Sequence, residues 1–212
     1  MKNKSDVSVM LKEAGILFAI TLIAGIMLGF VYELTKEPIR IQREKAIQEA
    51  CMAVFPGVEG MEFHALEGGA AAQDGVPESE LAADGVSIGT IYEAVDREGA
   101  FRGYVVETAS SRGYGGNIVL YVGIATDKTV TGVAVLDISE TVGLGMEASK
   151  VLTPQFAGRQ VQQFAYTKTG SRTDAEVDAI SGATITTKAV VNAVNGALRT
   201  AQNLLQGGET DE

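Results

Sequence analysis

The residues of this chain that are best suited to chemistry run from Asp178 to Thr184. There a carboxylate and two hydroxyls surround small residues that leave the backbone accessible. An apolar stripe with helical spacing follows over Ile185 to Leu205 and predicts a helix that opens here. A helix N-terminus presents free amides and the positive end of its dipole, so the segment is suited to a phosphate. The alternative is that Ser181 merely caps the helix.

Two further segments have glycine-rich content, Arg112 to Gly116 and Glu140 to Gly145. Such loops let a planar ligand or a phosphate approach the backbone, and they also serve as plain tight turns between strands. Neither matches a P-loop or a dinucleotide-binding fingerprint. Glu140 and Asp137 form either a carboxylate pair or two solvated acids at the end of a strand. The residues alone leave both alternatives open.

Composition excludes several classes of protein. The 212 residues carry 27 acidic and 17 basic side chains, a formal charge of −10, which argues against a nucleic-acid partner. With Cys51 as the only cysteine and His64 as the only histidine, we expect no intramolecular disulfide and no Cys/His metal cluster. The 25 glycines favour a fold rich in strands and turns. No catalytic residue and no metal ligand is predicted.

The segment from Ala14 to Tyr32 has no charged residue and is dominated by large apolar side chains. As a helix it would rise roughly 28 Å, close to the thickness of the hydrocarbon core of a bilayer. A cleaved signal peptide is the alternative, but its apolar region would be shorter. We therefore predict a retained transmembrane anchor. Its Gly25 and Gly29 are either spaced for contact with partner helices or incidental, since glycine is common in membrane spans. Lysines and arginines flank the segment on both sides, so charge does not orient it.

The elements that must position the glycine-rich loops follow the anchor. Residues 33–57 are predicted to form a helical stalk that ends at Pro56-Gly57, and Leu66 to Gly85 a surface loop or insertion. The remaining pattern predicts an α+β fold with a twisted, mainly antiparallel sheet and packed helices. Its predicted strands are Ser87 to Asp96, Phe101 to Ala109, Ile118 to Thr126 and Thr129 to Ile138. The last two form a hairpin that turns at Asp127-Lys128. A helix is predicted near Val151 to Phe156, a further strand within Gln160 to Tyr166, and an acidic disordered tail at 206–212.

The order of these motifs resembles the FMN-binding domain family. Gly113-Tyr114-Gly115-Gly116 comes first, then a hairpin, then the Glu140 to Gly145 loop, and then Asp178-x-x-Ser-Gly-Ala-Thr184. The chain is most similar to the G subunits of Rnf ion-translocating electron-transport complexes, which are related to the C subunits of sodium-pumping NADH:quinone reductases. The resemblance covers the anchor and nearly all of the region after it.

The resemblance implies covalent FMN, attached as a phosphoester to the Thr184 hydroxyl by a separate flavin transferase. It implies that the flavin lies among two sets of residues, Asp178, Ser181, Gly182 and Ala183 around the phosphate, and Glu140, Thr141, Gly143, Leu144 and Gly145 beside the ring. Thr186 and Thr187 are nearby hydroxyls outside the motif.

The implied role is a membrane-anchored subunit that relays electrons in a translocase coupling ferredoxin/NAD electron transfer to Na⁺ or H⁺ translocation. Its partners are the other membrane and peripheral subunits of that complex. Residues 1–13 are then a cytoplasmic tail, 14–32 the anchor of a cell-membrane protein, and 58–205 an extracytoplasmic FMN-binding domain. The alternatives are the role of the C subunit in a sodium-translocating NADH:quinone reductase, and a stand-alone extracytoplasmic reductase or sensor.

Two departures from the family pattern concern the ring side of the site. Val142 stands where the family loop usually has proline, and Asp137-Ile138-Ser139 stands where a histidine is often found. Both affect the expected contacts of the flavin ring rather than the attachment at Thr184.

Overall fold

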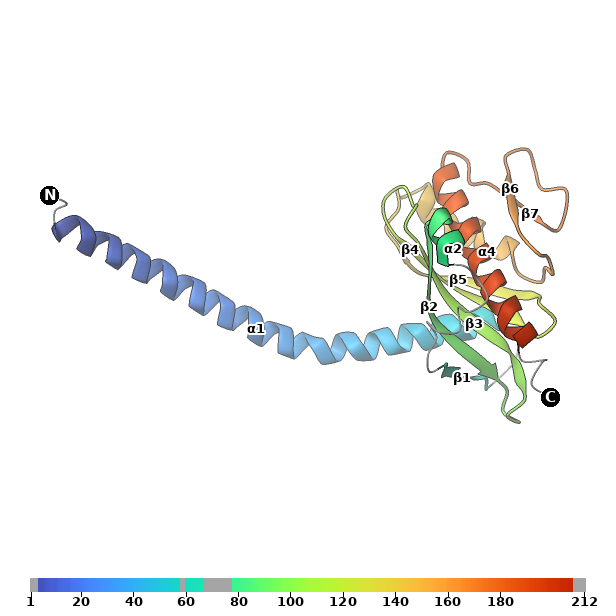
Figure 1. Cartoon of the computed structure of the whole chain (residues 1–212), viewed down its shortest axis with the longest axis horizontal. Coiled ribbons are helices and arrows are strands. Elements are labelled where there is room, and N and C mark those ends of the chain that lie inside the picture. The colour runs from blue at the N-terminus through green and yellow to red at the C-terminus, as the bar shows by residue number, and fades with distance from the viewer. Residues whose placement is uncertain (1–3, 58–59, 67–77, 208–212) are drawn as a thin grey trace. The chain divides into compact units, whose positions relative to one another are not determined.

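The computed structural model describes residues 4–57, 60–66 and 78–207, with side chains over 9–57, 60–66 and 79–207 (Figure 1). The chain divides into two compact units, Met1–Lys45 and Ala46–Glu212. Helix α1 (Lys4–Val54) begins in the first unit and supplies its last residues to the second.

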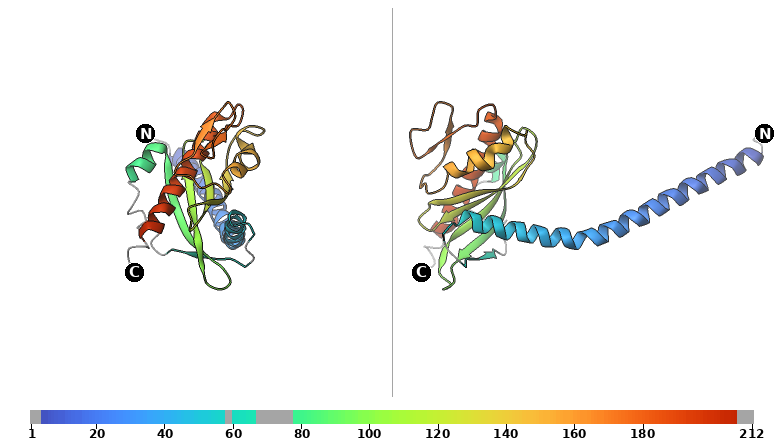
Figure 2. Two further views of the ribbon diagram at one scale, coloured as in Figure 1. Left: turned by 90° about the vertical axis from the view of Figure 1, so that its right-hand side faces the viewer. Right: turned by 180° about the vertical axis from the view of Figure 1, so that it is seen from behind.

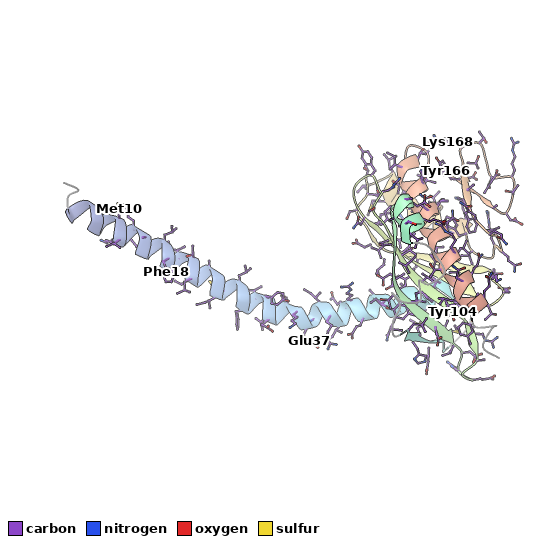
Figure 3. The ribbon with its side chains drawn as sticks, in the orientation of Figure 1. Met10, Phe18, Glu37, Tyr104, Tyr166 and Lys168 are labelled. Carbon is purple, nitrogen blue, oxygen red and sulfur yellow. The ribbon has the colours of Figure 1, made fainter. Side chains whose placement is uncertain are left out.

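The first unit is helical throughout its described length, and its large apolar side chains are exposed. Its helix is long and apolar enough to cross a membrane, as expected of a single-pass membrane anchor. The predicted anchor and the predicted stalk are continuous in this one helix. Pro38 lies inside it, and Glu37 lies at a bend (Figure 3). Proline removes a backbone hydrogen bond and crowds the preceding turn, which bends a helix without ending it.

The second unit is built on a five-stranded antiparallel sheet in the order β1-β2-β3-β4-β5. The strands are β1 (Glu62–Ala65), β2 (Val86–Val95), β3 (Phe101–Ser110), β4 (Ile118–Ala125) and β5 (Val130–Ile138). The α+β fold class predicted from the sequence is confirmed. The β4–β5 hairpin also forms where expected, with Lys128 in the left-handed conformation at φ 71°.

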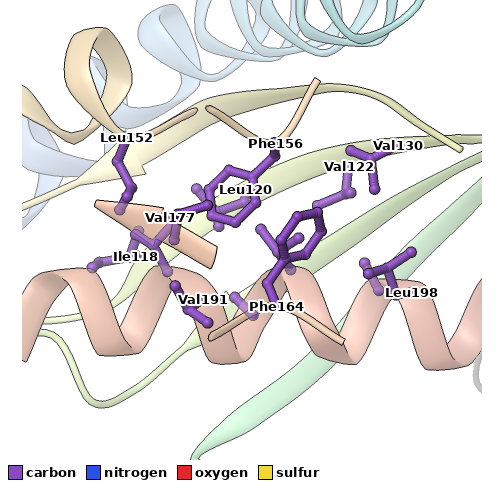
Figure 4. Packing of buried hydrophobic residues seen from close by; sticks show 14 of the residues in the cluster. Ile118, Leu120, Val122, Val130, Leu152, Phe156, Phe164, Val177, Val191 and Leu198 are labelled. Atoms are coloured by element: carbon purple, nitrogen blue, oxygen red, sulfur yellow. The ribbon is translucent and has the colours of Figure 1, made fainter. Parts of the chain in front are cut away.

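One face of this sheet is covered by α4 (Thr184–Gly207), as the views in Figures 1 and 2 agree. Alternate residues of β4 face this helix and are fully buried. Figure 4 shows Phe156 and Phe164 among the strand and helix side chains; their rings meet edge to face at 4.9 Å. This main core packs α4 against strands β2, β3 and β4.

The opposite face of the sheet receives the last turns of α1. Val54 is buried there beside Gly132, whose missing side chain makes the approach possible, since a Cβ on Gly132 would lie 2.9 Å from Val54 Cα. The Thr131 hydroxyl donates to the Val54 carbonyl. Cys51 and Tyr121 belong to this second core. The end of α1 is thus part of the folded domain.

Several smaller elements differ from the sequence prediction. Residues 78–84 of the expected surface loop form helix α2 (Glu78–Asp84), so that part of the expectation was wrong. Leu81 of this helix is buried against β2. Residues 67–77 of the expected loop lie outside the described residues. The strand expected within Gln160 to Tyr166 is only β6 (Ala165–Thr167), paired in parallel with β7 (Glu176–Asp178). Between β5 and β6 the chain forms η2 (Gly145–Glu147), α3 (Ala148–Val151) and η3 (Thr153–Gln155). Of the expected tail, 206–207 end α4, and 208–212 lie outside the described residues.

Candidate functional site

A cavity of about 480 Å³ lies where the two glycine-rich loops meet the start of α4. Its size falls within the range of small-molecule and cofactor sites. The lining residues come from three segments far apart in the sequence: Tyr114; Glu140, Thr141, Leu144 and Gly145; and Gly182, Ala183, Thr184, Ile185 and Thr186.

Glu140 connects the Glu140 to Gly145 loop with the Arg112 to Gly116 loop through a hydrogen bond. Its Oε1 accepts a hydrogen bond of 2.7 Å from the Tyr114 amide. The loops approach so closely that a Cβ on Gly113 would lie 2.6 Å from the same oxygen, and a Cβ on Gly115 would clash with the Ser139 carbonyl. Glycine at these positions is therefore needed for the close approach of the two backbones.

The Glu140 to Gly145 loop closes as a turn before η2. The Leu144 amide donates to the Thr141 carbonyl at 3.1 Å, and Gly143 adopts φ +76°. A left-handed φ favours glycine, so Gly143 shapes the turn rather than lining the cavity. Val142 is 85% exposed at the tip. The turn thus closes with valine in the place of the family's proline.

The start of α4 is held by Thr187 rather than by Ser181. The Ala183 carbonyl accepts the first helical hydrogen bond, from the Thr187 amide. The Thr187 hydroxyl also donates to that carbonyl at 2.9 Å, and it accepts from the Ile180 amide at 3.1 Å. Ser181 lies two residues before the capping position and is exposed, so the interpretation of Ser181 as the helix cap was wrong.

Several donors at this helix start point to a ligand. Within the described part of the chain, the amides of Thr184, Ile185 and Thr186 have no backbone acceptor, and the Thr184 hydroxyl has no hydrogen-bond partner. Thr184 is half-buried on the cavity wall. Free amides at the N-terminus of a 24-residue helix favour an anion there. The two neighbouring threonines are buried, at 1% exposure for Thr186 and 0% for Thr187.

The structure brings together most of the residues predicted for the site. Seven of them line the cavity, namely Glu140, Thr141, Leu144, Gly145, Gly182, Ala183 and Thr184. Gly182 has φ +77°, and a Cβ there would lie 3.2 Å from Leu144 Cδ2, so this glycine sets both the turn before α4 and the contact between the loops.

Asp178, Ser181 and Gly143 do not line this cavity. Asp178 ends β7, and its carboxylate accepts the Ser171 amide at 2.6 Å, while its own amide donates to Gln155 Oε1 at 2.7 Å. In this structure it orders the segment that leads to α4.

Sequence reasoning did not predict Ile185 and Thr186 as lining residues. Ile185 is 55% exposed, and an apolar residue on the polar side of this amphipathic helix was the available signal. Arg112 and Lys188 line a smaller cavity of about 150 Å³ that shares Ile185 with the first, so positive charge lies beside the site. Among the residues that the structure describes, no group of His, Cys, Asp and Glu is placed to hold a metal ion.

Comparison with known proteins places the same residues in a described family. The family described as FMN-binding domain matches residues 113–199, which include all three segments that line the cavity. The chain is 31% identical to the G subunit of the Na⁺-translocating ferredoxin:NAD⁺ oxidoreductase complex of Acetobacterium woodii, over 96% of this chain and 97% of that one. It is 32% identical to the G subunit of the ion-translocating oxidoreductase complex of Methanosarcina acetivorans, over 92% and 95% of the two chains.

A third relative bears on the transported ion. The G subunit of the proton-translocating ferredoxin:NAD⁺ oxidoreductase complex of Clostridium ljungdahlii is 30% identical, over 88% of this chain and 92% of that one. Relatives named for Na⁺ and for protons thus both reach about the same identity to this chain, 31% and 30%. Among solved structures, the C subunit of the Na⁺-translocating NADH-quinone reductase of Parabacteroides distasonis aligns with a TM-score of 0.48 and 25% identity, over 70% of this chain and 78% of that one.

Proposed function

This chain belongs to the FMN-binding domain family, among the G subunits of ion-translocating oxidoreductase complexes, and we propose that it carries FMN bound covalently to Thr184. The observation that carries the proposal is the Thr184 hydroxyl, which has no partner among the described residues, on a cavity wall that also presents the amides of the first turn of α4. A phosphate esterified to this hydroxyl lies at the positive end of the helix dipole. Thr187 is unsuited because it is fully buried and both of its hydrogen-bonding functions are engaged.

The cavity residues fit the rest of an FMN molecule. Leu144, Ile185 and Tyr114 offer apolar surface for a planar ring, and Gly145 and Gly182 leave room beside the backbone. When bound, FMN supplies a carrier that exchanges one or two electrons. The protein residues hold this carrier at one place and one orientation, and the covalent link prevents its loss.

Attachment requires a separate enzyme, because a threonine hydroxyl is a weak nucleophile without an activating base or metal. We propose a flavin transferase that uses FAD. The Thr184 oxygen forms the new bond to the phosphorus of the FMN half as the bond between the two phosphates breaks. AMP leaves, and the hydroxyl proton passes to a base of the transferase. Half-burial of Thr184 keeps its hydroxyl within reach.

In the proposed cellular role, the chain relays electrons within an Rnf-type complex that couples ferredoxin/NAD electron transfer to Na⁺ or H⁺ translocation. The names of its relatives support this role, and the apolar helix supports a place in the cell membrane. Residues 1–13 then lie in the cytoplasm and 58–205 on the extracytoplasmic side. The other subunits of the complex supply and remove the electrons.

The proposal is tested by expressing the full chain with and without a flavin transferase and viewing flavin fluorescence after denaturing electrophoresis. We expect a fluorescent band that requires the transferase and is lost in Thr184→Val, which replaces the hydroxyl with a methyl group and keeps the side-chain shape. Thr186→Val serves as the matched control and keeps the band. A band that persists in Thr184→Val contradicts the proposed attachment.

A further inference from the structure

A second cavity, of about 150 Å³, lies beside the main cavity at the start of α4 and carries positive charge. Five residues line it, namely Arg112, Ile185, Lys188, Ala189 and Asn192. None of the five is acidic, although the chain has 27 acidic and 17 basic residues. Two cations around one cavity repel each other, so an anion between them stabilises the arrangement. The volume is below the roughly 300–1,000 Å³ of cofactor sites, which limits the occupant to a small group.

Arg112 is fixed at the edge of this small cavity by α2 and the turn after it. Its Nη2 donates to the Ala83 carbonyl at 2.6 Å, and its stem lies so close to Gly85 that a Cβ there would be 2.6 Å from Arg112 Cγ. The acceptor is a neutral carbonyl, and within the part of the chain that the structure describes Arg112 forms no ion pair. The guanidinium has further N–H donors, so both its charge and most of its donors are left for a ligand.

Lys188 lies one turn after Thr184 on the same ridge of α4. Residues four apart are neighbours on a helix surface, and a rise of 1.5 Å per residue separates these two by about 6 Å along the axis. Asn192, which also lines the small cavity, continues the ridge by another turn. Helical side chains lean toward the N-terminus, so the exposed Lys188 chain extends toward the turn of Thr184. Its ammonium has no hydrogen-bond or ion-pair partner among the described residues.

The two cavities adjoin at the first turn of α4, because Ile185 lines both of them. A phosphodiester on Thr184 keeps a full negative charge. The helix dipole supplies the equivalent of only about half a positive charge at its N-terminus, so it balances this charge in part. Lys188 is the first basic residue of α4, and ammonium and guanidinium groups bind phosphate through charge-assisted hydrogen bonds.

We propose that Arg112 and Lys188 form a basic subsite for the phosphate of the flavin on Thr184. Lys188 contributes one charge from the helix that carries the flavin, and Arg112 contributes the other from the first glycine-rich loop. This inference rests on the proposed function, because it takes the phosphate from FMN. Free inorganic phosphate has the same chemistry, so the experiment must distinguish the two sources of the anion.

The test uses the full chain in detergent, made with and without the flavin transferase. Lys188→Gln removes the charge and Lys188→Arg keeps it. Lys168→Gln is the matched control, because it removes one charge from an exposed lysine that lines neither cavity. The melting temperature is followed with a thiol-reactive dye read outside the flavin emission band, since the only cysteine, Cys51, is 1% exposed in the second core.

The readout is the gain in melting temperature that attached flavin gives each variant. In Lys188→Gln this gain is expected to fall by about 1–3 °C at low salt, the share of one exposed ion pair. Lys188→Arg restores the gain, and Lys168→Gln leaves it unchanged. Salt screens exposed charges, so the wild-type gain falls between about 0.02 and 0.5 M KCl more steeply than that of Lys188→Gln.

Arg112→Gln tests the second charge of the subsite. It also loses the bond to the Ala83 carbonyl, which lowers the flavin-free and flavin-bound forms equally. The expected further loss appears only in the flavin-bound form and therefore as a smaller gain.

Inorganic phosphate identifies the source of the anion. Phosphate stabilises folded proteins in general, so the specific response is the rise in melting temperature that the wild type shows beyond Lys188→Gln when phosphate replaces chloride at equal ionic strength. We expect this response in the flavin-free chain and its loss in the flavin-bound chain, whose subsite is filled. An equal response in both forms assigns the subsite to a free anion and overturns the inference.

The inference is also overturned if Lys188→Gln lowers the melting temperature equally in both forms, or if it leaves the gain from flavin unchanged. In-gel fluorescence of the same samples separates this failure from that of the proposed function. A wild-type chain without a fluorescent band removes covalent FMN itself. A normal band with an unaltered gain removes only the role of Arg112 and Lys188.

Discussion

Thr187→Val is expected to destabilise the domain, although it keeps the shape of a fully buried side chain. The substitution removes the acceptor of the Ile180 amide and the second donor to the Ala183 carbonyl. That carbonyl keeps its bond from the Thr187 amide, so the main loss is the buried Ile180 amide, which becomes unpaired. An unpaired buried amide costs about 1–3 kcal/mol, and the added methyl group returns at most about 0.8 kcal/mol.

From the middle of that range the expected net loss is therefore about 1 kcal/mol in the free energy of unfolding, or a few degrees in melting temperature for a domain of this size. Reaction of Cys51 with a thiol-specific dye during heating measures it, because this side chain is shielded only while the domain is folded. Thr187→Ser keeps the hydroxyl and is the control for its role. The reasoning is refuted if Thr187→Val stays within about 0.5 kcal/mol of the wild type, the range of ordinary surface substitutions.

Two further predictions concern the second core. Gly132→Ala is expected to destabilise the domain by about 1–3 kcal/mol, because the new Cβ would lie 2.9 Å from Val54 Cα and push the end of α1 off the sheet. Urea unfolding measures the loss. Gly207→Ala, which has open space and no left-handed φ, is the control for altered backbone freedom. Stability is also expected to fall at alkaline pH. Burial and, to a lesser degree, the Glu107 carboxylate raise the pKa of the Cys51 thiol from 9.0 to about 12. Its contribution is complete below the unfolded pKa and is lost as pH rises toward the folded one. Cys51→Ala should flatten the decline between about pH 9 and pH 12, whereas an unchanged slope would assign the decline to Tyr92 and Tyr121, whose pKa values burial also raises.

The main strands and the final helix could be predicted from the sequence because their burial follows their period. Ile118, Leu120 and Val122 alternate along β4 and are all fully buried under α4. The short elements carry no such pattern. β1 and β7 have only four and three residues, and their pairing depends on neighbours brought close by the rest of the fold.

The candidate site could likewise be predicted only in part from the sequence. The glycine-rich loops were recognisable from residue types, and Thr184 was singled out by the resemblance to the FMN-binding domain family; the structure places them around one cavity. The role of Asp178 could not be predicted, because its carboxylate turns toward Ser171 only once β7 has formed. The difference between Thr186 and Thr187 was also hidden in the sequence. It depends on which side of α4 faces Gly145 and which faces the Ile180 amide.

Tandem mass spectrometry of the tryptic peptide spanning residues 173–188 is the most direct test of covalent FMN on this chain. The peptide contains Thr184, Thr186 and Thr187, and fragmentation places a modification on one of them. For a chain matured with the flavin transferase, we predict the mass of FMN less one water on Thr184. The same mass on Thr186 or Thr187, or an unmodified peptide from a chain that still holds flavin, would contradict the account.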